Sequence, residues 1–272
     1  EVIENSAFRY RNNLISVTLT EGIKTIRGNA FYGCEALKKA MLPQSLTAIE
    51  GQAFTNCSAL TEITLPAGLT TLEGSAFEGC SSLKSMAIPE GITEIENSLF
   101  RHCTALTGII LSSKTQAIKF YAFEGCTALA TIEIPNSVTE IRFNAFRDCT
   151  SFTQIVIPDG VKEIDNNAFK NCSSLRKVVL PKELEEIAYD AFYGCSALTE
   201  IEIPSTVHRI GSDVFTGCSS LTSVKIPNAI TEINSNTFAG CTSLATITFP
   251  GKINYIGDGA FRDCTALSQV VF

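Results

Sequence analysis

The 272-residue sequence lacks the features by which most enzymes, nucleic-acid binders and membrane proteins are recognised. Its formal net charge is −7, so no global basic field exists to attract nucleic acid or an anionic membrane. No run of about 18 apolar residues occurs, so we expect no segment to span a bilayer. The sequence also has no Cys-x-x-Cys, Gly-rich phosphate loop, Gly-x-Ser-x-Gly or His-Glu-x-x-His pattern. We therefore expect neither an enzyme nor a cofactor.

Cysteine, in contrast, is abundant and strictly periodic. A spacing of 23 residues needs no disulfide framework or metal motif, but a stack of identical supersecondary units produces it. About twelve copies fill residues 1–272 without an insertion, so we expect a single solenoid domain. Because the chain opens at Glu1 in mid-repeat, we expect it to be a fragment of a longer chain. The eleven cysteines are Cys34, Cys57, Cys80, Cys103, Cys126, Cys149, Cys172, Cys195, Cys218, Cys241 and Cys264.

The cysteines are expected to be free, buried thiols. Eleven is odd, so at least one has no partner within the chain. Stacked rungs lie about 4.8 Å apart, like neighbouring strands. Parallel Cβ vectors keep the β-carbons near that distance, beyond the roughly 3.8 Å mean for a disulfide. The sequence therefore predicts a ladder of thiols that pack as small hydrophobic groups.

Counted from each cysteine as zero, every repeat contains an alternating segment typical of a strand. Leucine follows at +3, with Phe152 as the exception, and apolar residues follow at +6 and +8, as in Ile155 and Ile157. Positions +5 and +7 are variable and mostly polar, which is the period of a half-buried strand. All nine prolines stand at +9, where the missing N–H ends the strand.

The remainder of each repeat returns the chain to its starting side. Segments such as Pro158-Asp-Gly predict a type I turn with proline in its second position. A short extended pair follows at +12 and +15, and a helical turn is expected to carry Ala-Phe at +19 and +20. Gly, Asn or Asp at +22 in ten of eleven copies predicts a left-handed residue before the cysteine.

One repeat carries the whole pattern: Cys149-Thr-Ser-Phe-Thr-Gln-Ile-Val-Ile-Pro-Asp-Gly-Val-Lys-Glu-Ile-Asp-Asn-Asn-Ala-Phe-Lys-Asn-Cys172. It resembles the BspA-like, or Treponema pallidum-type, leucine-rich repeat family of bacterial surface proteins, and the resemblance covers the chain. It implies a right-handed leucine-rich-repeat coil of about twelve 23-residue rungs. A parallel sheet would lie on the concave face, with short extended segments and helical turns on the back. The resemblance further implies an extracellular or cell-surface location and an adhesive, protein-binding role.

The outward positions +5 and +7 of the concave strands are the predicted binding surface. Position +7 is more apolar than a purely solvated face requires, and an apolar strip with a polar border is typical of a protein-binding patch. We also expect cross-strand ion pairs between Lys177 and Glu200 and between Glu202 and Lys225. The alternative interpretation is that the β-branched residues at +7 are present only because they favour strand structure. The predicted binding residues are Ile110, Glu133, Gln154, Val156, Lys177, Val179, Glu200, Glu202 and Lys225.

Two other functions stay open. The segment could be a structural spacer or stalk that presents another domain, or a carbohydrate-binding array. A carbohydrate-binding array would carry aromatic residues at the outward +5 and +7 positions of the concave strands. These positions contain no aromatic residue before the terminal strand. The partner we expect is a protein, such as an extracellular matrix component or another cell surface.

The repeat that contains Cys103 departs most from its neighbours. Ser112 replaces proline, Thr115 takes the apolar +12 position, and Phe120-Tyr121 replaces residues that are usually small or polar. Phe143 holds the +17 position of the next repeat, and the three aromatics Phe120, Tyr121 and Phe143 are predicted as a secondary contact patch. The alternative is that they fill a local gap beside the turn without proline.

The residues that could form a catalytic pair or a metal site are also explained by the repeat structure. His102 adjoins Cys103, but Cys103 holds the ladder position and His102 the turn position. Glu140, Glu163 and Glu186 share the +14 position and could attract Ca²⁺, but such a column is more often solvated. We expect no metal site. The C-terminal strand leaves apolar residues up to Phe272 without a covering rung, which predicts end-to-end self-association or further chain.

Overall fold

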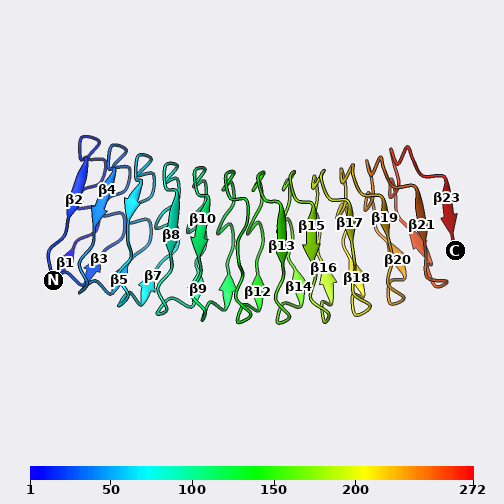
Figure 1. Cartoon of the computed structure of the whole chain (residues 1–272), viewed down its shortest axis with the longest axis horizontal. Helices are drawn as coiled ribbons and strands as arrows, with labels where there is room; N and C mark the ends of the chain where they lie inside the picture. Colours follow the sequence, from blue (N-terminus) through cyan, green and yellow to red (C-terminus); the bar gives the residue numbers. More distant parts are fainter.

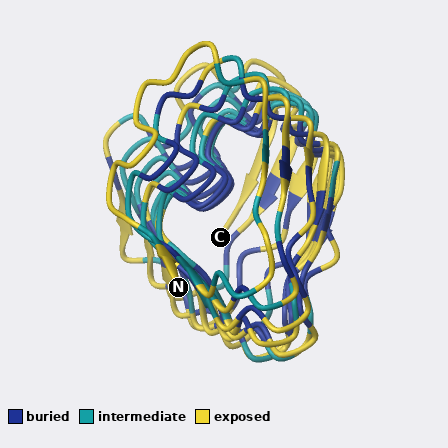
Figure 2. Cartoon of the chain, turned by 90° about the vertical axis from the view of Figure 1, so that its left-hand side faces the viewer, coloured by how far each residue is buried: buried dark blue, intermediate teal, exposed yellow.

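The computed structural model describes all 272 residues as one stack of coils, or rungs, with two rows of short strands. Figure 1 shows these rows along the long axis, and Figure 2, which looks along the stack, shows each rung as a closed loop with buried residues inside. All strand pairs are parallel and join equivalent positions 23 residues apart, such as Ile155 with Val178. The predicted parallel-sheet solenoid of about twelve turns is confirmed.

The first row is the predicted strand at +5 to +7, and its outward side is called the long-strand face. Glu62–Ile63, Glu200–Ile201 and Ser223–Val224 are two-residue strands, and the others have three residues. The row consists of β2 (Ser16–Thr18), β4 (Lys39–Met41), β6 (Glu62–Ile63), β8 (Ser85–Ala87), β10 (Gly108–Ile110), β13 (Gln154–Val156), β15 (Lys177–Val179), β17 (Glu200–Ile201), β19 (Ser223–Val224), β21 (Thr246–Thr248) and β23 (Gln269–Val271). Residues 131–133 hold this position in their rung without forming a strand.

The second row holds the short extended segments, and its outward side is called the short-strand face. Each strand covers +14 and +15, so the apolar +15 residue points inward and the polar +14 residue outward, as in β14. The row consists of β1 (Val2–Ile3), β3 (Thr25–Ile26), β5 (Ala48–Ile49), β7 (Thr71–Leu72), β9 (Glu94–Ile95), β11 (Ala117–Ile118), β12 (Glu140–Ile141), β14 (Glu163–Ile164), β16 (Glu186–Ile187), β18 (Arg209–Ile210), β20 (Glu232–Ile233) and β22 (Tyr255–Ile256).

The expected helical turns are absent, because the structure contains no helix. Residues at +18 and +22 both have positive φ, as in Asn29 (57°) and Gly33 (67°), which interrupts any helical run. Backbone N–H groups alternate instead between two partners. Phe31 donates to the carbonyl of Ala53 in the next rung at 2.8 Å, whereas Tyr32 donates to Asn29 within its own rung at 3.1 Å. The left-handed residue predicted at +22 is confirmed, including His102 (59°).

The turn after the strand also differs in register from the expectation. The N–H of Val161 donates to the carbonyl of Pro158 at 3.0 Å, so proline is the first residue of the turn, not the second. In the view of Figure 1 the rod bends only slightly along its length.

The core is one continuous cluster of 77 buried residues that runs from Ile26 to Ala260. The phenylalanines at +20 stack nearly parallel, with centroids 5.1 Å apart for Phe31 and Phe54 and 5.9 Å apart for Phe77 and Phe100. No rung covers its own apolar side chains, so each depends on its neighbours for burial.

All eleven cysteines are free, as predicted, and only Cys264 is not fully buried. Burial raises the pKa of the interior thiols well above the ordinary value. The thiols are therefore protonated and inaccessible, and they serve as packing groups.

Candidate binding surface on the long-strand face

Along each strand of the long-strand face, side chains alternate between the core and the surface. In β13, Ile155 is 2% exposed and forms part of the core, whereas Gln154 and Val156 point outward. The inward residue anchors the rung, so the outward residues are free to contact a partner without holding the fold together.

The structure brings two of the predicted apolar residues into direct contact across strands. Val156 and Val179 are register partners in β13 and β15, and they are 63% and 41% exposed. Ile110 is 70% exposed but lies two rungs away from Val156, with Glu133 in the rung between them. The predicted apolar strip is therefore a Val156–Val179 pair and a separate Ile110, divided by a carboxylate.

The polar border follows the predicted positions but not the predicted ion pairs. Gln154 and Lys177 are register partners. Neither Lys177 with Glu200 nor Glu202 with Lys225 forms an ion pair, and this expectation was wrong. The sheet is interrupted between β15 and β17, and Lys225, which directly follows β19, makes an isolated bridge with Thr248 of β21. The charged groups of this border are thus left for solvent or a ligand.

A hollow of about 500 Å³ opens on the same face, over β6, β8, β10 and residues 131–133. Ser85, Ala87 and Gly108 lie outward there and have little or no side chain, and Ile110 stands in the lining. The sheet is interrupted between β6 and β8 and again after β10, which separates the strands at this point. The hollow was not predicted from the sequence, although small residues at the outward +5 and +7 positions of two successive repeats were a signal for it.

The predicted secondary patch lies on the other side of the coil, next to the short-strand face. Phe120 is 44% exposed, and the ring of Tyr121 meets that of Phe143 edge-on, with centroids 5.3 Å apart. Phe143 therefore pairs with Tyr121 of the preceding rung. The guanidinium of Arg101 lies over the Tyr121 ring, 5.2 Å from its centroid.

A column of alternating charges beside this patch was also missed. The Nε of Arg101 donates to Glu124 at 2.6 Å, and Glu78 and Arg147 extend the column on either side at 3.7 Å. The Glu124 side chain is only 5% exposed and lies between these two arginines. The signal was the sequence Glu, Arg, Glu, Arg at +21 in four successive repeats.

The acidic column of Glu140, Glu163 and Glu186 contains no cluster of three side chains that could hold a metal ion. Arg142 pairs with Glu140 at 2.8 Å and Arg209 with Glu186 at 2.7 Å. Glu163 has no cation partner, and burial, then the neighbouring Glu186, raises its pKa above the ordinary value.

His102 and Cys103 show no catalytic arrangement. The Cys103 thiol is buried and donates to the carbonyl of Phe77 at 3.2 Å, and burial raises its pKa. His102 is an exposed residue with left-handed backbone. No helix long and apolar enough to cross a membrane is present.

The stacked parallel strands, the leucine at +3 and the open strand face define a leucine-rich-repeat solenoid, a scaffold that typically binds proteins and is typically not an enzyme. The model of the BspA type leucine rich repeat region matches in six copies over residues 1–107, 93–196 and 185–272. The chain belongs to the BspA-type leucine-rich repeat family.

Solved structures of bacterial proteins are similar over almost the whole chain. A leucine-rich repeat protein from Bacteroides ovatus is 29% identical, with a TM-score of 0.74, and covers 99% of this chain and 81% of its own. A leucine rich cell surface protein from Faecalibacterium prausnitzii is 33% identical, with a TM-score of 0.67, and covers 99% and 82%. A leucine-rich repeat protein from Eubacterium ventriosum, 22% identical with a TM-score of 0.58, covers 93% and 83% and supports the fold alone. No curated protein matches the chain.

Proposed function

We propose that the chain is an extracellular or cell-surface module that adheres to a protein through the long-strand face. The observation that carries the proposal is the exposed Val156–Val179 pair, which has no structural role in the core and is bordered by Gln154 and Lys177. An apolar centre with a polar border is the composition of protein-binding patches. The partner class is a matrix protein or a protein of another cell surface. The similarity to a leucine rich cell surface protein supports this location.

The hollow adds a second contact point on the same face. It lies beside Ile110, so one partner that spans the middle of the array reaches both the hollow and the valine pair. Main-chain groups at the interrupted edges of β6 and β8 are available there for hydrogen bonds with the partner.

The test of this proposal replaces both valines by negatively charged glutamate. The double variant Val156→Glu and Val179→Glu should unfold like the wild type, because neither side chain is buried, and should lose binding to immobilised extracellular matrix proteins. The matched control is Thr248→Glu, which places the same charge at the same +7 position near the end of the array. Ile155→Ala, by contrast, should destabilise the array by about 2–5 kcal/mol. Undiminished binding by the double glutamate variant contradicts the proposal.

A spacer role is the second candidate, and the rod-like shape in Figure 1 favours it. A spacer needs no specific face, so neither valine substitution would change its function. Absence of any protein partner for the wild-type chain, together with a recognisable binding domain elsewhere in the full-length protein, would support this candidate.

A further inference from the structure

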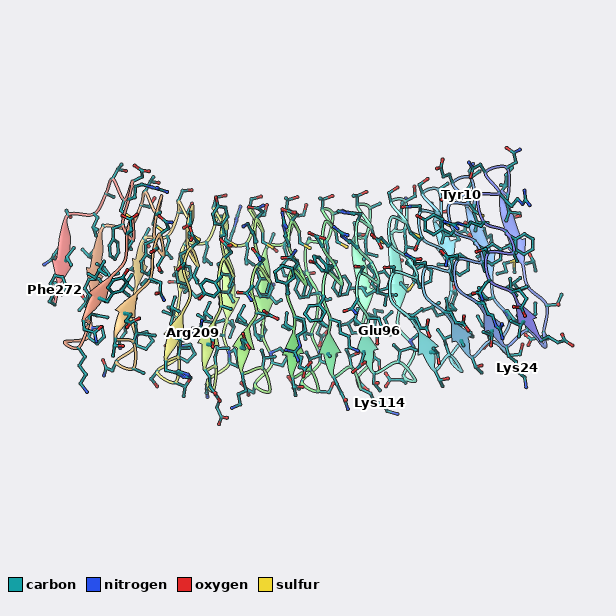
Figure 3. All side chains as sticks on the ribbon, turned by 180° about the vertical axis from the view of Figure 1, so that it is seen from behind. Tyr10, Lys24, Glu96, Lys114, Arg209 and Phe272 are labelled. Atoms are coloured by element: carbon teal, nitrogen blue, oxygen red, sulfur yellow. The ribbon has the colours of Figure 1, made fainter.

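Three aromatic residues on the side of the coil away from the proposed protein-binding face form an aromatic strip, which comprises Phe120, Tyr121 and Phe143. They follow the short strands β11 and β12, which are register partners, so they lie in neighbouring rungs. Figure 3 shows the molecule from this side, with Glu96 and Arg209 labelled in rungs before and after the strip. Phe120 is exposed and the other two rings are half-buried.

Tyr121 occupies a backbone conformation that a bulky residue rarely adopts. Its φ is +61°, at the +18 position where other rungs have residues such as Asn144 or Asn167. Small polar residues tolerate this conformation better than tyrosine does. Every rung has positive φ at +18, so the feature particular to this rung is the bulky aromatic side chain that Tyr121 places there. The tyrosine ring is also held in place, between the Arg101 guanidinium and the Phe143 edge.

The cations that border the aromatic strip are already paired. Arg101 is paired with Glu124, Lys119 with Glu94 and Glu96, and Arg142 with Glu140. These cations are not free to attract an anionic ligand, so the chemistry of the strip suits a neutral one. The exposed rings are also too few for a stable protein interface, which buries about 800 Å² on each partner.

An amide is fixed beside the exposed ring. The Oδ1 of Asn97 accepts the N–H of Phe120 at 3.2 Å, which orients the side-chain amide and leaves its NH₂ group for a ligand. The same arrangement recurs at Asn166 and Tyr189, at 3.1 Å, where Arg209 lies over the tyrosine ring. One column thus holds an amide before the Phe120 and Phe143 rings and another before the Tyr189 ring, at a rung spacing of about 5 Å.

We propose that the aromatic strip and Asn97 bind a neutral oligosaccharide. The apolar face of a pyranose ring packs on Phe120, a hydroxyl accepts from the Asn97 amide, and the next sugar reaches the Tyr121–Phe143 pair one rung further along. The strain at Tyr121 is then explained by the ring it presents. This site is independent of the long-strand face.

The test uses residues that other rungs already carry at the same positions. The triple variant Phe120→Asn, Tyr121→Asn and Phe143→Asn installs the side chains of Asn97, Asn144 and Asn166 and should fold at least as stably as the wild type. Affinity electrophoresis with hydroxyethyl cellulose, laminarin and yeast mannan measures neutral-glycan binding, and alginate serves as the acidic probe. The wild type should be retarded by at least one neutral polymer, and the triple variant should bind that polymer about tenfold more weakly or worse.

A second variant separates the two faces. Val156→Glu with Val179→Glu should keep full glycan binding. Failure of the wild type to bind any neutral polymer, binding of alginate alone, or equal binding by the triple variant would overturn the proposal. If the triple variant lost a protein partner and the wild type bound no glycan, the strip would be a protein contact and the proposal would fall.

Discussion

The thiol of Cys149 donates a hydrogen bond across one rung to the carbonyl oxygen of Phe123, with an Sγ–O distance of 3.2 Å. The same oxygen accepts the backbone N–H of Cys126 at 3.1 Å. Each interior phenylalanine carbonyl at +20 therefore joins the cysteine three residues later in the chain to the equivalent cysteine 23 residues further on. The cysteine Sγ packs against apolar neighbours and also donates a hydrogen bond, which explains why a sulfhydryl fits this position.

The first prediction concerns thiol reactivity. Native protein should react slowly with a thiol reagent, because burial both hides the sulfur atoms and raises their pKa, to about 12 for Cys241. Cys264, which is half-buried at the end of the stack, should react first. Mass spectrometry after labelling identifies the site. Denatured, unreduced protein should yield close to eleven thiols, and recovery of five disulfides would contradict the ladder.

Thr115→Val should stabilise the protein. The Thr115 side chain is fully buried, and its Oγ1 has no hydrogen-bond partner, so valine removes an unsatisfied hydroxyl at nearly constant shape. We expect a gain of about 1 kcal/mol in urea unfolding. The matched control is Thr237→Val, which should destabilise because the equally buried Thr237 donates to Asn234 at 2.8 Å. A loss of stability in Thr115→Val would show that its hydroxyl has a partner.

Glu163→Gln should stabilise the protein at neutral pH and not in acid. The raised pKa of Glu163, caused by burial and by its register partner Glu186, means that the folded state binds a proton more readily than the unfolded state. Stability from this group is fully present below its ordinary pKa and is lost as the pH rises through the raised value. Removing the charge should recover about 0.2–1 kcal/mol at pH 7.

The control for Glu163 is Glu140→Gln, which breaks the ion pair with Arg142 and should lower stability slightly at neutral pH. Urea unfolding measured between about pH 3 and pH 7 distinguishes the two variants. Equal pH profiles for Glu163→Gln and the wild type would refute the assignment.

The last prediction concerns hydrogen exchange at the junction between the rung of β6 and β7 and the rung of β8 and β9. The amides of Gln116 and Lys119 donate to the preceding rung, at 2.7 and 2.9 Å, whereas the equivalent amides of Thr93 and Glu96 have no such partner. Both rows of strands are interrupted at this junction, between β6 and β8 and between β7 and β9. By NMR, Thr93 and Glu96 should exchange faster than Gln116 and Lys119. Equal protection at the two pairs would show that the junction is closed in solution.

Much of the candidate surface followed from the repeat because a strand alternates its side chains. Ile155 inside and Val156 outside could be assigned from a 23-residue period and the alternation of strand residues alone. The left-handed residue at +22 was predicted from Gly, Asn and Asp, and the structure extends it to His102. A similar enrichment at +18, as in Asn29 and Asp190, was overlooked, and it would have argued against a helical turn.

The sequence by itself determined the rung, the ladders and the family, because identical side chains at a fixed period can be buried only by stacking equivalent rungs. Only the tertiary structure decided where the stack is imperfect. Whether β6 reaches β8, or whether Lys177 reaches Glu200, depends on how unlike side chains in neighbouring rungs tilt the strands, and a period carries no information about that. Those irregularities create the hollow and leave Lys177 unpaired, and the substitution of Tyr121 into a turn suited to asparagine creates the aromatic strip.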